Sequence, residues 1–190
     1  DQLLETAVLG EDDVTWLGIE LLAEQSWDVT PAGMDLYNGV PGIALFLAYA
    51  GSILNEGQYT NLARRAANGI LRHVELFSAE LPGVGGFEGW GGILYTITHL
   101  ARLWQDETLF AQTAQLVDVV ARFIEEEEDY SVVSGAAGAV ASLLALYHCQ
   151  PSAKTLETAV ACGDHILAAA QPMEEGLGWL ERLDNPTSQG

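Results

Sequence analysis

The chain has 190 residues, 49% of them hydrophobic and 18% charged, a composition that argues against a disordered or collagen-like protein. Seven Lys and Arg against 27 Asp and Glu give a formal net charge of −20, which argues against nucleic acid and anionic membranes as partners. Two cysteines, Cys149 and Cys162, no signal peptide and no apolar stretch of about 20 residues predict a soluble, cytoplasmic, acidic protein without disulfides.

Apolar residues recur at helical spacing along the chain, and no sustained period-two alternation stands out. The sequence therefore predicts an all-α protein, with helices over residues 14–25, 42–54, 58–78, 91–104, 107–127, 137–149 and 153–171. Asp12 and Asp13 precede the first of these helices as capping residues. The acidic run Glu125–Asp129 is predicted to be a solvated helix end, with a docking site for a basic peptide as the alternative.

Three of the predicted helices follow a Gly-x-x-Gly motif. The first motif lies in "DLYNGVPGIALFLAYAG", the second in "EGWGGILYTITHLARLW" and the third in "SGAAGAVASLLALYHC"; their glycines are Gly39 and Gly42, Gly89 and Gly92, and Gly135 and Gly138. We expect each helix to begin at or just after the second glycine. Glycine suits a site where neighbouring backbones crowd together, and Pro41 suits a first helical turn.

The motifs belong to a helical repeat of just under 50 residues. The first glycines of the motifs are 50 and 46 residues apart, and Ala66, Ala114 and Ala161 in the intervening helices are 48 and 47 residues apart. Helices that follow a motif are apolar all round, whereas the others are amphipathic and alanine-rich. Residues 1–190 thus form a single segment with repeats at about 12–54, 58–104, 107–149 and 153–190. Two layers of helices indicate an α/α toroid or a solenoid.

The glycine-rich stretch "PGVGGFEGWGG" (82–92) raises the alternative of a phosphate-binding loop. No Gly-Lys-Ser/Thr follows it and no strand is predicted before it, so close packing explains these glycines better.

The three motif segments resemble the LanC-like cyclase domain of class II lanthipeptide synthetases. The resemblance runs from about Asp12 to the end of the chain and corresponds to the N-terminal portion of such a domain. It implies an α/α toroid, incomplete in this chain, whose inner ring holds zinc. That zinc activates cysteine thiolates of a precursor peptide for addition to dehydrated Ser and Thr, which forms lanthionine and methyllanthionine rings. In bifunctional members an upstream domain performs the dehydration with ATP.

The same resemblance places the zinc ligands, a Cys and a Cys-His pair, in later repeats, together with a candidate acid/base histidine. None of these residues is present here, so the chain is expected to bind no cofactor, to supply toroid wall and to be inactive alone. Its open edge should expose apolar surface, which predicts the remaining half of the domain or self-association as partner.

The resemblance also implies an acid/base aspartate four residues before the first glycine of the third motif. That position is Ser131 in this chain, and Asp129 is a displaced candidate if the loop bulges. Tyr37, Trp90 and His99 lie at or near the motifs and are candidates for contact with a peptide; core packing is the alternative for each. Tyr147 is a further candidate of the same kind.

One local group of residues imitates a zinc site. Cys162 and His165 share a helix face, but His148 and Cys149 are adjacent and diverge by roughly 100° on a helix, so we expect no metal there. Two further functions stay open. One is a non-catalytic helical repeat that binds peptides, and the other is an α/α-toroid glycosidase with Asp35 and Glu88 as its carboxylates.

Overall fold

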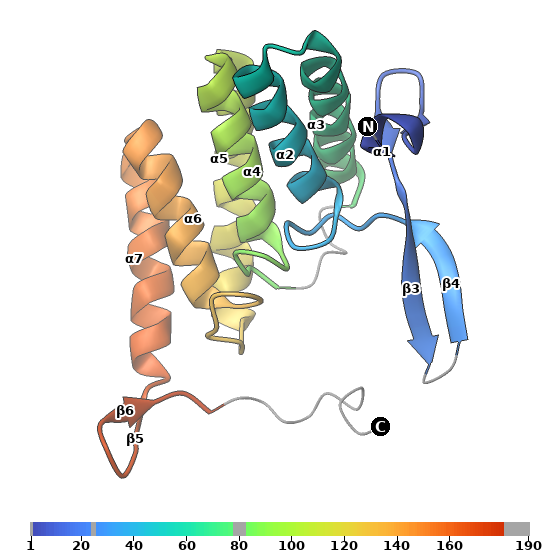
Figure 1. Ribbon diagram of the computed structural model, residues 1–190. Helices are drawn as coiled ribbons and strands as arrows, with labels where there is room; N and C mark the ends of the chain where they lie inside the picture. Colours follow the sequence, from blue (N-terminus) through green and yellow to red (C-terminus); the bar gives the residue numbers. More distant parts are fainter. Residues whose placement is uncertain (1, 24–25, 78–82, 181–190) are drawn as a thin grey trace. The chain divides into compact units, whose positions relative to one another are not determined.

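The computed structural model describes residues 2–23, 26–77 and 83–180, and most of these residues are helical (Figure 1). Their contacts divide into two compact units, one within residues 2–77 and the other within residues 83–180. Within the described ranges, no helix is both long enough and apolar enough to cross a membrane. Each unit has a core of packed helices and short antiparallel hairpins.

The first unit contains one pair of packed helices and two hairpins. Its elements in chain order are α1 (Gln2–Glu5), β1 (Val8–Leu9), β2 (Val14–Thr15), β3 (Leu17–Ala23), β4 (Ser26–Pro31), α2 (Val40–Leu54) and α3 (Gly57–Phe77). Helices α2 and α3 pack along each other and bury small side chains such as Ala44, Ala48 and Ala66. Small residues let the two helices approach closely, so this pair forms the core of the unit.

The helix predicted over residues 14–25 is wrong, because the described part of this segment forms strands β2 and β3, and residues 24–25 lie outside the described residues. Leu17, Ile19 and Leu21 recur with a period of two, and β-branched residues in both strands favour extended backbone. The pairing of β3 with β4 is antiparallel, with Ile19 opposite Val29 and Leu21 opposite Trp27. Strands in the described part of the chain are confined to three two-stranded hairpins.

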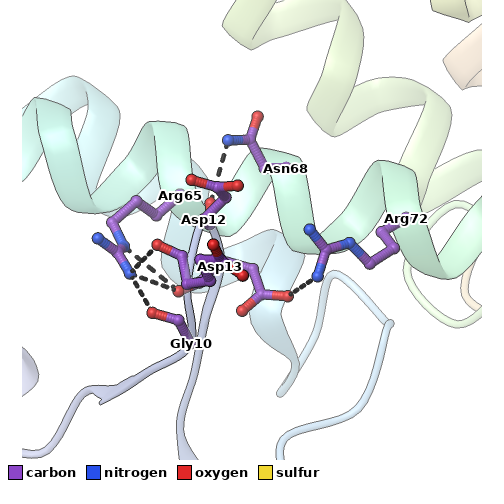
Figure 2. A network of polar contacts seen from close by, with 7 residues as sticks. Gly10, Asp12, Asp13, Arg65, Asn68 and Arg72 are labelled. Carbon is purple, nitrogen blue, oxygen red and sulfur yellow. Dashed lines mark hydrogen bonds and ion pairs between the residues drawn. The ribbon is translucent and has the colours of Figure 1, made fainter.

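A polar network fixes the loop of residues 10–13, between β1 and β2, to helix α3 (Figure 2). The Arg65 guanidinium donates to main-chain carbonyls of this loop, with a shortest distance of 2.7 Å. The Asn68 amide donates to another loop carbonyl at 3.1 Å, and Arg72 pairs with the Asp13 carboxylate at 2.9 Å. These bonds to one helix hold the start of the chain in place.

The second unit contains two helix pairs. Its elements are α4 (Trp90–Trp104), α5 (Glu107–Phe123), a short 3₁₀ helix (Ile124–Glu126), α6 (Ala136–Cys149), α7 (Ala153–Ala168), β5 (Gln171–Pro172) and β6 (Leu177–Gly178). Helix α4 packs on both α5 and α6, while α7 packs on both α6 and α5. The helices that follow a Gly-x-x-Gly motif therefore form one layer of this unit, and the intervening helices form the other. This is the layering that the repeat predicts.

Six of the seven predicted helices are confirmed, with ends within a few residues of those expected. Ser78, the last residue of the helix predicted over 58–78, and the part of the fourth predicted repeat after Leu180 lie outside the described residues. Helices α2, α4 and α6 begin two residues before the second glycine of each motif rather than at or after it, because the first glycine is the N-cap and the second lies inside the first turn. By contrast, α5 and α7 are capped by the side chains of Asp106 and Ser152.

The apolar sequences of the helices that follow the motifs predict burial on every side, but not all of these helices are buried in this way. Helix α4 buries ten of its 15 residues, among them all of Trp90–Leu94. Helix α2 instead exposes Phe46, Tyr49 and Ile53. The difference follows from the number of neighbours within each unit, since α4 packs on two helices and α2 on one.

Candidate functional site

The N-terminal ends of α2, α4 and α6 are formed by one repeated loop. The first amide of each helix donates to a carbonyl seven residues earlier, from Val40 to Gly33 at 2.8 Å, from Trp90 to Gly83 at 3.3 Å and from Ala136 to Asp129 at 2.8 Å. In each loop, a Cβ on the first glycine would also meet the carbonyl oxygen six residues before it. The equal spacing aligns the three loops residue by residue, so Ser131 in the third corresponds to Asp35 in the first.

Within the second unit, the loops of the second and third motifs lie against each other. The amides of Gly86 and Phe87 donate to the carbonyls of Val132 and Val133 at 3.1 and 3.0 Å. A Cβ on Gly138 would collide with the amide nitrogen of Gly86 and with the carbonyl of Val132, so the backbones are in contact at this crossing. Close packing thus explains Gly86 and Gly138, as the sequence predicts for the glycine-rich stretch.

Gly89 has a second reason to be glycine. Its φ of +142° is a conformation that residues with a Cβ rarely adopt. This geometry turns the chain sharply into α4 directly after Glu88. The Glu88 carboxylate is exposed and accepts a hydrogen bond from the Ser134 hydroxyl at 3.1 Å, which connects the two motifs through side chains as well.

Glu127 is a further residue that holds these loops together, and sequence analysis missed it. Its carboxylate accepts hydrogen bonds from the amides of Val84 at 3.0 Å and Asp129 at 2.9 Å. Its carbonyl lies 2.7 Å from the Nε2 of His165, whose ring packs against Tyr130 with centroids 5.6 Å apart. The residue is half-buried within an acidic run that looked uniformly solvated, so no local signal distinguished it.

Ser131 performs the same local task as its counterpart in the first motif. The Asp35 carboxylate accepts a hydrogen bond from the Asn38 amide at 2.8 Å, and the Ser131 hydroxyl accepts one from the Ser134 amide at 3.1 Å, again three residues later. The third loop keeps the seven-residue register of the others and contains no bulge. Asp129 uses its carboxylate to accept the Ser131 amide at 2.7 Å. The hydroxyl therefore retains the turn-capping function of aspartate but not its negative charge.

The aromatic candidates occupy different environments. Tyr37 is 73% exposed, whereas Trp90 has no exposed surface and its indole nitrogen has no hydrogen-bond partner. His99 is half-buried and packs against the Tyr95 ring with centroids 4.1 Å apart. Burial, and secondarily the charge of Arg102, lowers the pKa of His99. Tyr37 thus has free surface for a partner, and Trp90 does not in this conformation.

The cysteines and histidines do not form a metal centre in the described part of the chain, where no three ligating side chains cluster. Cys162 is fully buried, and burial raises the pKa of its thiol to about 11, while His165 is already paired with a carbonyl. Cys149 is the last residue of α6 and accepts a hydrogen bond from Arg102 at 3.5 Å, beside a groove of about 590 Å³. A zinc site needs three or four ligands that converge on one point, so these described residues do not fit the metal.

A comparison of the sequence with models of protein families shows to which family the chain belongs. Residues 30–189 match the family described as "Lanthionine synthetase C-like protein". The chain belongs to the lanthionine synthetase C-like family. None of the curated proteins compared with the chain matches it. The match includes all three Gly-x-x-Gly motifs and begins within β4, so the paired helices are consistent with part of a LanC-like α/α toroid.

Proposed function

We propose that this chain is part of the cyclase domain of a class II lanthipeptide synthetase, an enzyme that forms thioether rings in a precursor peptide in the cytoplasm. The observation that carries the proposal is the family match over residues 30–189, which coincides with three loops of identical hydrogen-bond register. In this reaction a peptide thiolate adds to the β-carbon of a dehydrated Ser or Thr, and the α-carbon then takes up a proton. The substrate is thus the dehydrated precursor peptide.

In this reaction, we propose that most residues of the motif loops hold the loops in place and do not take part in the chemistry. Glu127 and the crossing of Gly86 with Gly138 fix the second loop to the third, while the exposed Tyr37 offers its side chain to a bound peptide. The zinc that activates the thiol does not fit the described Cys and His residues, so we propose that other segments of the complete domain hold it. The proposed partner of this chain is then the remaining half of the cyclase domain.

Ser131 limits what this chain contributes to proton transfer. A serine hydroxyl does not replace a carboxylate as an acid/base near neutral pH, and losing such a group typically lowers a rate by about 10²–10⁴. The proposal therefore includes slow ring formation, unless another group donates the proton.

The test uses the full-length protein that contains this chain, with a dehydrated peptide that carries free cysteines. Ring formation removes thiols, so N-ethylmaleimide labelling followed by mass spectrometry counts the rings formed. Ser131→Asp is expected to raise the rate of thiol loss, and Ser131→Asn is the matched control because it caps the loop without an ionisable group. Asp129→Asn should leave the rate unchanged. Thiol loss that is unaffected by Ser131→Asp and abolished by Asp129→Asn would assign the acid to Asp129 instead.

One observation favours a second function, a non-catalytic helical repeat that binds peptides. The position of the family's acid is uncharged here, while the loop keeps its fold through the Ser131 hydroxyl. In the same assay, a protein that binds the dehydrated peptide but removes no thiols, with or without Ser131→Asp, would establish this function. For a glycosidase, Asp35 and Glu88 lie in different units, and no observation brings them together.

A further inference from the structure

The hairpin of β3 and β4 presents one apolar face that nothing in the described part of the first unit covers. Opposite residues of an antiparallel pair project to the same face, and alternate pairs share it. The register pairs Leu17 with Pro31, Ile19 with Val29 and Leu21 with Trp27, which therefore form a single face. All six residues are exposed, and Ile19 at the centre is 73% exposed. We refer to these six residues as the hairpin face.

The hairpin is held firmly at its base but unsupported along its length. The Ala32 amide donates to the Trp16 carbonyl at 2.7 Å, and Trp16 is buried, with its indole nitrogen bonded to the Leu3 carbonyl at 2.8 Å. Arg65 fixes the neighbouring loop of residues 10–13 to α3 (Figure 2). An isolated two-stranded hairpin is marginally stable in water and needs packing on its apolar face. We therefore expect the hairpin face to pack against another surface.

We propose that the hairpin face is a homodimer interface, in which two copies of this chain pack face to face about a twofold axis. The exposed fractions of the six residues correspond to roughly 600 Å² of accessible surface per copy, so complete burial in two copies would remove about 1,200 Å², the lower end of the range for stable interfaces. A face without ionisable groups places no unpaired charge between two copies, and twofold pairing converts two hairpins into a four-stranded sandwich.

Charge sets the conditions under which the dimer forms. Asp28 lies at an alternate position of the hairpin, outside the hairpin face. Each copy nevertheless carries a formal charge of −20, so two copies repel each other over longer distances. Added salt screens this repulsion and is expected to strengthen the dimer. This interface does not depend on the proposed cyclase function, because most of the hairpin precedes the matched residues 30–189.

The test is sedimentation equilibrium of the 190-residue chain across a wide concentration range. Ile19→Glu places two carboxylates in the interface by symmetry and should raise the dimer Kd by about 100-fold or more. Ile53→Glu is the matched control, because Ile53 is 78% exposed on α2, outside the hairpin face. The wild type and Ile53→Glu should be dimers that tighten with salt. Circular dichroism verifies folding, and Val29→Ser provides a milder second variant.

Three outcomes would overturn the proposal. The first is a wild-type chain that stays monomeric at all concentrations and salt levels. The second is equal dissociation by Ile19→Glu and Ile53→Glu. The third is dissociation by Val160→Glu on the exposed side of α7 but not by Ile19→Glu, which would place the interface on the helices.

Discussion

Replacing Gly138 by alanine tests whether the backbone crossing of the second and third motifs organises the second unit. Gly138 lies in the first turn of α6, and its added Cβ would meet the amide nitrogen of Gly86 and the carbonyl oxygen of Val132. These two atoms are hydrogen-bonded to each other at 3.1 Å. Because both belong to the backbone, neither moves aside as a flexible side chain would. The substitution therefore displaces one loop from the other.

The expected loss of stability combines three contributions. Overpacking at a close contact typically destabilises by about 1–3 kcal/mol. Losing the hydrogen bond between Gly86 and Val132 adds about 1 kcal/mol. Alanine has a higher helix propensity than glycine, which stabilises the folded state by about 1 kcal/mol. The net effect of Gly138→Ala is thus a decrease of about 1–3 kcal/mol in the free energy of unfolding.

The chain offers a matched control on α7. A Cβ on Gly163 would meet no atom within 4 Å, so Gly163→Ala should raise the free energy of unfolding by about 0.5–1 kcal/mol. Urea unfolding followed by circular dichroism measures both values, and hydrogen exchange of the Gly86 amide reports the crossing locally. If Gly138→Ala is as stable as Gly163→Ala, and the Gly86 amide stays protected, the reasoning about this contact is wrong.

Two further predictions concern titratable groups. Burial raises the pKa of the Cys162 thiol to about 11. Iodoacetamide at pH 8 should therefore alkylate only Cys149 in the folded chain, and both thiols in urea. Labelling of Cys162 before Cys149 in the folded chain would contradict the burial of Cys162. Burial lowers the pKa of His99 from its usual 6.5, so protonation favours the unfolded state. Its contribution to stability should be complete above about pH 6.5 and decline as the pH falls through the lowered pKa. His99→Gln should remove this part of the decline in urea titrations between pH 7 and 5, and an unchanged decline would exclude His99 as its source.

The sequence by itself determined the paired helices and the positions of the three motifs. Apolar periodicity is a local property, so six helices were predictable to within a few residues. Glycine and proline restrict backbone conformation locally, and they marked the starts of α2, α4 and α6. The same reasoning failed over residues 14–25, where Leu17, Ile19 and Leu21 suit either a helix or a strand. Pairing with β4 selects the strand, and that partner cannot be read from a short window.

The tertiary structure alone decided how the motif residues work together. Glu127 bonds to an amide 43 residues away, and Glu88 to a hydroxyl 46 residues away, so no nearby residue reveals either contact. The close approach of Gly138 to Gly86 likewise depends on how α6 packs on α4. The sequence showed that Ser131 lacks the carboxylate of Asp35, but only the folded loop shows that its hydroxyl keeps the same turn bond. Local composition fixes the six long helices, whereas the hairpin of β3 and β4 and the contacts between distant residues depend on tertiary pairing and packing.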